Sequence, residues 1–209
     1  MSTNNTDLAT LTGSRICHDL ASPVGAALTG LDFLSGAPGG ASPDEMALLR
    51  DSLTGARATL EMLRTAFGRA GRGAARDAAS LGTTARGHLA ARPRLQLEWS
   101  LDGRLAPVAA QHLALAILCA AHALPRGGTL AVAGSDAEGL RVTATAEGDL
   151  AAEAALWDGL TGHSALPAAD VRQVEFHLLA AHIARGDARI EVIRGDQSLA
   201  IALLLPAQD

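Results

Sequence analysis

The sequence predicts an α+β protein, in which a helical hairpin precedes a mixed sheet covered by helices on one face. Residues 7–67 carry apolar side chains at helical spacing, interrupted once by a segment rich in proline and glycine. Residues 80–205 alternate between segments with helical and strand patterns. Hydrophobic residues make up 48% of the chain but aromatic residues only 2%, so aliphatic side chains must fill the core. We therefore expect two units, residues 1–72 and residues 80–209.

The first helix is expected at residues 7–35, after a polar and frayed start at residues 1–6. Residues 36–43 then break the helix with two prolines and three glycines. At about 100° per residue, one stripe of this helix is apolar, and its members are Ile16, Leu20, Val24, Ala27, Leu31 and Leu34.

The second helix is expected to start at Pro43, with Ser42 as its N-cap and Glu45 at the capping-box position. A lone hairpin of two such helices leaves much apolar surface in water, whereas two hairpins paired into a four-helix bundle bury it. We therefore expect a homodimer; packing of the hairpin against the second unit is the competing solution. The apolar seam of the second helix consists of Met46, Leu49, Leu53, Ala56, Leu60, Leu63 and Phe67.

The polar face of the first helix carries one histidine, His18. Small residues surround it one or two turns away, so a second protein has room to approach; they are Ser14, Ser22, Gly25 and Thr29. Neutral imidazole is a good nucleophile near neutral pH, because its unperturbed pKa is about 6.5. Asp19 can orient the ring or take its proton, and Pro23 should bend the helix. On the helical pattern alone, a solvated surface histidine is the alternative.

The second unit is expected to follow a helix end and linker at residues 68–79. Its expected order of helices and strands predicts a mixed sheet with helices on one face. The expected helices cover residues 80–91, 107–124, 150–159 and 167–184, and the expected strands cover residues 95–101, 129–133, 140–146, 188–193 and 199–205.

The stretch from His18 to Pro23, His-Asp-Leu-Ala-Ser-Pro, resembles the H-box of histidine kinases. Nearly the whole chain resembles the histidine phosphotransferases of the ChpT type. This resemblance implies a dimeric hairpin in which His18 is phosphorylated and Asp19 assists, followed by an α/β sandwich like a degenerate histidine-kinase ATP-binding domain. It also implies two kinds of partner, the receiver domain of a hybrid histidine kinase (CckA-like) and response regulators (CtrA-like). We expect Ser14, Arg15, Ser22 and Gly25 to contact these partners.

The resemblance to the kinase ATP-binding domain depends on residues 123–132, which contain a Pro-Arg-Gly-Gly turn leading into a strand. Cys119 stands where the family has an asparagine that helps to bind Mg-ATP, and Ala146 stands in place of the aspartate that contacts adenine. The glycine-rich lid is absent. We therefore expect no productive ATP binding and no cofactor of the protein's own, with Mg²⁺ on the partner receiver domain. The alternatives are an active histidine kinase with a divergent ATP site, using Glu147, and a non-catalytic dimeric adaptor for response regulators.

Composition excludes several other classes. All 17 basic residues are arginine, which excludes Schiff-base lysines and a P-loop lysine. A net charge of −5 without a basic tract disfavours nucleic-acid binding. No apolar run reaches about 18 residues and no leader peptide is apparent, so we expect no membrane span and a cytoplasmic location.

The helix expected at residues 107–124 carries three side chains of the kind that bind zinc. His112, Cys119 and His122 share one face of it, but a helical rise of about 10 Å separates His112 from Cys119, too far for one metal. Cys119 and His122 alone supply two ligands where structural zinc takes four. His177 and His182 lie roughly 140° apart around their helix and do not converge. The sequence therefore predicts no metal site.

Overall fold

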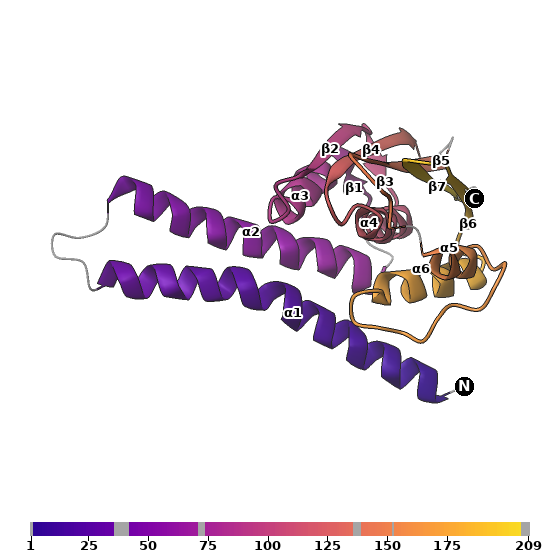
Figure 1. Ribbon diagram of the computed structural model, residues 1–209, viewed down its shortest axis with the longest axis horizontal. Coiled ribbons are helices and arrows are strands. Elements are labelled where there is room, and N and C mark those ends of the chain that lie inside the picture. The colour runs from indigo at the N-terminus through magenta and orange to yellow at the C-terminus, as the bar shows by residue number, and fades with distance from the viewer. Residues whose placement is uncertain (1, 36–41, 71–73, 136–138, 152, 206–209) are drawn as a thin grey trace.

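The computed structural model describes residues 2–35, 42–70, 74–135, 139–151 and 153–205. Helices α1 (Ser2–Ser35) and α2 (Pro43–Phe67) form an antiparallel hairpin that projects from a compact helix and sheet unit (Figure 1). The helix α1 begins earlier than predicted, and the predicted frayed start is wrong for residues 2–6. The first glycine of the chain is Gly13, and no glycine or proline before it stops the helix.

The predicted start of α2 is confirmed. The Ser42 hydroxyl accepts a hydrogen bond from the Glu45 amide at 3.3 Å, and the Glu45 carboxylate accepts one from the Ser42 amide at 2.8 Å. Hydrogen bonding from Ser42, chiefly from its backbone amide, favours the charged carboxylate and lowers the pKa of Glu45. Pro23 lies inside α1, and Figure 1 shows that α1 bends along its length, as expected of a helix with an internal proline. Most of the predicted break, residues 36–41, lies outside the described residues.

The remaining elements follow in chain order. The helices are α3 (Ala78–Leu89), α4 (Pro107–His122), α5 (Ala154–Leu160) and α6 (Val174–Ala184). The strands are β1 (Arg76–Asp77), β2 (Leu95–Ser100), β3 (Arg104–Leu105), β4 (Gly128–Ser135), β5 (Gly139–Ala146), β6 (Arg189–Arg194) and β7 (Ser198–Leu204).

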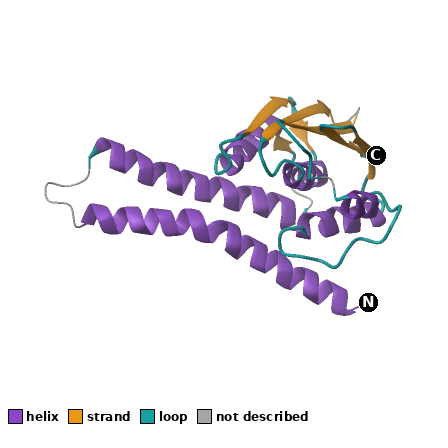
Figure 2. Ribbon diagram, in the orientation of Figure 1, coloured by secondary structure: helices purple, strands orange, loops and turns teal. Residues whose placement is uncertain are grey.

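Five strands form the main sheet in the order β2-β4-β5-β7-β6. Strands β2 and β4 run parallel and the other pairs antiparallel, so the sheet is mixed. Figure 2 shows the strands as one layer with the helices of this unit on one side of it. Alternate side chains of β4 and β5 face these helices, among them Leu130, Val132 and Val142, which are at most 1% exposed. The predicted α+β class is confirmed.

Two features of this unit differ from the prediction. The helix α6 begins at Val174 and not at residue 167, because the preceding residues form turns. The Asp170 carboxylate accepts a hydrogen bond from the Arg172 amide at 2.8 Å, a local bond that competes with helix formation. The short antiparallel pair of β1 and β3 was not predicted. Two-residue strands carry too little pattern to be recognised.

The buried core continues from the hairpin into the second unit. Met62, Leu63 and Ala66, near the end of α2, are at most 1% exposed and belong to the same cluster as the apolar residues of α4. The N-terminal half of α1 runs beside α6 (Figure 1). The hairpin is therefore anchored at its base and projects freely at its other end. Whether the units divide at residues 72 and 80 stays a prediction.

Among the described residues, no helix is both long enough and apolar enough to cross a membrane.

Candidate functional site

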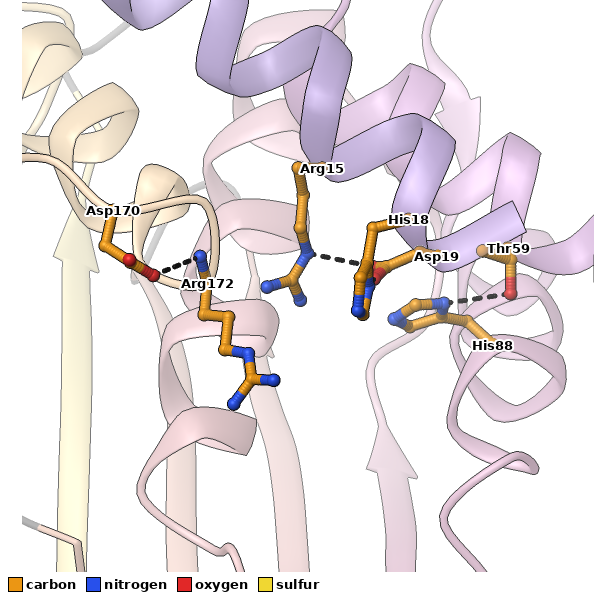
Figure 3. A network of polar contacts seen from close by, with 7 residues as sticks. All are labelled: Arg15, His18, Asp19, Thr59, His88, Asp170 and Arg172. Carbon is orange, nitrogen blue, oxygen red and sulfur yellow. Dashed lines mark hydrogen bonds and ion pairs between the residues drawn. The ribbon is translucent and has the colours of Figure 1, made fainter. Parts of the chain in front are cut away.

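His18 lies on α1 with its side chain 63% exposed (Figure 3). Its Nδ1 is 3.0 Å from Oδ1 of Asp19. Because an ionised carboxylate can only accept hydrogen bonds, Nδ1 must be the nitrogen that carries the proton. The lone pair of the neutral ring is then on Nε2. The sequence predicted that Asp19 could orient the ring. The Asp19 carboxylate lies at hydrogen-bonding distance from Nδ1, where it could do so.

Arg15 holds Asp19 in turn. The guanidinium Nε donates to Oδ2 of Asp19 at 2.8 Å, and the side chains of Arg15 and Asp19 are only 17% and 16% exposed. The two residues are four apart on one helix, the spacing at which side chains meet. The three residues form a chain of contacts from a largely buried arginine side chain to an exposed imidazole. The sequence prediction gave Arg15 a partner-contacting role and missed this pairing, although the spacing could have revealed it.

The other predicted contact residues surround His18 as expected. Ser14, Ser22 and Gly25 are all exposed. A Cβ added to Gly25 would meet no atom within 4 Å, so the surface beside it is open. Their contact with a partner, like that of Arg15, stays a prediction.

Buried titratable groups of the second unit lie close to this chain of contacts. Figure 3 shows the His88–Thr59 pair beside Asp19, with Nδ1 of His88 3.2 Å from Oγ1 of Thr59. Burial lowers the pKa of His88 to about 4, and the Asp19 carboxylate acts in the opposite direction.

Glu175, at the start of α6, is 1% exposed, and its Oε2 has no hydrogen-bond partner. Burial raises its pKa to about 7, while the Arg15 guanidinium acts to lower it. The Arg15 guanidinium on α1 therefore acts on a buried carboxyl of α6.

Cys119 is the residue that the sequence resemblance aligned with an asparagine of the kinases. Cys119 is completely buried in α4, and burial raises the pKa of its thiol well above the usual value. Gly127 and Gly128 have φ values of 108° and 139° and form the turn into β4 that was predicted. A Cβ on either glycine would collide with backbone oxygens, of Arg94 and Thr145 respectively. These glycines therefore serve a tight turn, as expected from the sequence.

The described residues contain one group of His, Cys, Asp or Glu side chains close enough to share a metal ion, His112, His182 and Asp187. Neither Cys119 nor His122 belongs to it. The sequence did not reveal the group that is present, because His112 and His182 come from different helices.

The fold and the site together define an α+β protein with an exposed, carboxylate-oriented histidine on a helical hairpin joined to a mixed-sheet unit. The family described as "Histidine phosphotransferase C-terminal domain" matches residues 78–198. The chain belongs to this family, and the match covers the unit that follows the hairpin.

Two individual proteins extend the comparison. The protein phosphotransferase ChpT of Brucella abortus (strain 2308) is 39% identical over 139 residues, which are 63% of this chain and 64% of that protein. The chain thus matches less than two thirds of the length of this relative. A solved structure of a bacterial phosphotransferase superposes with a TM-score of 0.73 at 27% identity, over 95% of this chain and 96% of the other. That superposition includes the hairpin, which the family match does not reach.

Proposed function

We propose that this chain is a histidine phosphotransferase that relays a phosphoryl group through His18 between aspartates of receiver domains in a multistep phosphorelay. The observation that carries the proposal is the exposed imidazole of His18, whose Nδ1 is held by Asp19. The membership in the phosphotransferase family supports it.

In the proposed first step, the lone pair on Nε2 of His18 attacks the phosphorus of an aspartyl phosphate on a docked receiver domain. The new N–P bond forms as the bond from phosphorus to the aspartyl oxygen breaks, and the aspartate leaves as a carboxylate. Positive charge develops on the imidazole, and the carboxylate of Asp19 stabilises it through the proton on Nδ1. The second step reverses this reaction on the aspartate of another receiver domain.

Little covalent machinery is needed for this transfer beyond positioning and charge stabilisation. In this proposal the receiver domain supplies Mg²⁺, and the chain uses no cofactor of its own. The donor is the receiver domain of a hybrid histidine kinase (CckA-like), and the acceptors are response regulators (CtrA-like). Ser14, Ser22 and Gly25, which are small and exposed, let the receiver approach His18.

We also propose that the chain acts as a homodimer in which two hairpins form a four-helix bundle. The support is the apolar surface of the hairpin. Two helical stripes of large apolar side chains remain 41–57% exposed, Val24, Leu28 and Leu31 on α1 and Met46, Leu53 and Leu60 on α2. Exposed apolar stripes of this kind are typical of a site that binds protein.

The test is phosphate incorporation from γ-labelled ATP. One reaction contains this chain alone, and a second adds a cognate hybrid kinase whose receiver domain is shown to be phosphorylated. We expect acid-labile, base-stable label on this chain in the second reaction only, and none on His18→Ala. His163→Ala is the matched control, since His163 is another exposed histidine but lies in a loop after α5.

Each other outcome points to a different function. Label on the chain alone would mean an active histidine kinase with a divergent ATP site. No label in either reaction, with a phosphorylated cognate donor, would mean a dimeric adaptor in which His18 only contacts its partner.

A further inference from the structure

His112 lies in the middle of the buried core without a polar partner. The residue is 0% exposed, and neither Nδ1 nor Nε2 of its ring has a hydrogen-bond partner. Buried polar side-chain atoms nearly always have one, so an imidazole with two orphaned nitrogens calls for an explanation. The phosphotransfer step proposed above uses neither His112 nor any residue that touches it.

Two further ligand-type side chains converge on His112 from the end of α6. The ring of His182 lies with its centroid 5.0 Å from that of His112, at an interplanar angle of 79°. The Nδ1 of His182 is 3.4 Å from Oδ2 of Asp187. One ligand atom from each of the three residues lies within 4.8 Å of the other two.

These separations are close to those of a tetrahedral zinc site. Zinc binds imidazole nitrogen and carboxylate oxygen at about 2.0–2.2 Å, which places neighbouring ligand atoms about 3.4 Å apart. The His182 and Asp187 atoms already have this separation. His112 would complete the set by a small movement of its side chain.

A pocket of about 420 Å³ adjoins this group and leaves room for a further ligand. His182 and Asp187 line it, together with Gln111, whose Oε1 is buried and has no partner. A water molecule in this pocket or the Gln111 oxygen could fill the fourth position.

We propose that His112, His182 and Asp187 bind one Zn²⁺ ion. Two imidazole nitrogens and one carboxylate oxygen with an open fourth position form a donor set typical of zinc.

The charge state of the ligands and of their neighbours bears on this proposal. Burial, followed by the nearby His182, lowers the pKa of His112 to about 4, so the ring is neutral and its lone pair is available at pH 7. Arg185 opposes the metal, because its Nε lies 3.3 Å from Oδ2 of Asp187. The Arg185 side chain is 59% exposed, so it can turn into solvent when the carboxylate takes up a cation.

The site would connect three parts of the fold. The pocket is lined by residues 66–70 at the end of α2, by Val108 and Gln111 of α4, and by residues at the end of α6. An ion held by α4 and α6 beside the end of α2 would stabilise the base of the hairpin against the second unit, since a ligand that binds only the folded state raises its stability.

The experiment is titration of the untagged, metal-free full-length chain with Zn²⁺ in a calorimeter, paired with thermal unfolding. We expect one ion per chain and an increase in the melting temperature on adding Zn²⁺. Titration with Co²⁺ should give the intense visible absorption of a tetrahedral site, which reports the ligands independently of stability. Asp187→Asn and His182→Ala should each weaken Zn²⁺ binding by at least about 100-fold, since even outer-shell changes around a metal cost about 10–100-fold.

His177→Ala is the matched control. His177 lies on the same helix and also has a buried ring nitrogen without a partner, but it is not part of the group, so binding should be unchanged. Arg185→Gln should tighten binding, because it removes the competing cation.

Absence of stoichiometric Zn²⁺ binding would overturn the proposal and leave His112 and His182 as an edge-to-face ring pair only. Binding that survives both Asp187→Asn and His182→Ala would place the ion elsewhere and overturn it as well.

Discussion

At the scale of single residues, the carboxylate of Asp19 bonds two partners at once, the ring of His18 and the guanidinium of Arg15. Replacing it with the isosteric amide in Asp19→Asn keeps the shape but removes the charge that stabilises the developing imidazolium. Hydrogen bonds to charged groups contribute about 1.5–3 kcal/mol, so phosphoryl transfer should slow by about 10- to 100-fold.

The measurement for Asp19→Asn is single-turnover transfer from a phosphorylated receiver domain to His18, at saturating and at limiting receiver. Circular dichroism of the variant should match that of the parent chain. An unchanged rate at saturating receiver would show that Asp19 does not act on the reacting ring.

A double-mutant cycle separates two proposed roles of Arg15. If Arg15 acts by positioning Asp19, Arg15→Gln should slow transfer in the parent chain but cause little further loss in the Asp19→Asn background. If Arg15 instead contacts the receiver directly, as the sequence suggested, the two losses in transition-state stabilisation should add. The measured quantity is the transfer rate at limiting receiver for both single variants and the double variant.

The site residues differ in how far the sequence could reveal them. His18 and Asp19 are adjacent and lie in a contiguous motif, so a helical pattern and a motif suffice. The group of His112, His182 and Asp187 joins α4 to the end of α6, and no local spacing indicates that these helices meet there. Burial is also invisible in a short sequence window. Nothing in the sequence around His112 shows that both of its ring nitrogens are buried without partners.

At the scale of secondary-structure elements, α6 carries a buried carboxyl, Glu175, whose pKa is raised to about 7 by burial. Between the ordinary value of 4.5 and about 7, the folded chain keeps a proton that the unfolded chain releases. The contribution of Glu175 to stability therefore falls as pH rises through this window and stays low above it. Glu175→Gln, which is neutral at all pH values, should be more stable than the parent at pH 8 by up to about 3 kcal/mol and nearly equal to it near pH 4.5.

Urea unfolding of both chains at several pH values, at one fixed protein concentration, measures this difference. His88 and His112 titrate in both chains, so their effects cancel in the comparison. Glu191→Gln, at an exposed position on β6, should not change the pH dependence. A stability difference between Glu175→Gln and the parent that does not vary with pH would contradict the assignment.

Most elements could be predicted from the sequence, because their signals are local. The capping box at Ser42 and Glu45 fixed the start of α2, and alternating apolar residues marked the main strands. Predicted boundaries were wrong where a side chain accepts a hydrogen bond from a nearby backbone amide, as Asp170 does from the Arg172 amide before α6. Similarly, Asp77 caps α3 through the Ser80 amide, so this helix starts at Ala78, before the predicted residue 80.

At the scale of the whole molecule, the apolar seam predicted for α2 divides into two sides. Ala56 and Leu63 are buried on the inner side, whereas Met46, Leu53 and Leu60 stay 41–53% exposed. The sequence predicted the seam but not this division, because the contact of α2 with the second unit depends on the tertiary fold. The base of the hairpin packs on the second unit, as in the competing arrangement, and its outer part keeps an apolar surface that the proposed dimer would bury.

The exposed side of α2 predicts how the proposed dimer can be broken. Leu53→Glu places a charge in the middle of the exposed stripe, where it would be buried without a partner in a four-helix bundle, at a cost of several kcal/mol. In the single chain the same position is 53% exposed, so the fold should tolerate the change. We expect the parent chain to have the mass of a dimer by light scattering after gel filtration and Leu53→Glu to have the mass of a monomer.

Ala47→Glu is the control. Ala47 is exposed and lies about 120° around α2 from Leu53, so this change should leave the mass unchanged. Leu53 lies on α2 and is not among the residues proposed to contact the receiver, so the monomeric variant should still accept phosphate from a receiver domain. Loss of both dimer and transfer would instead mean that the receiver docks across two chains.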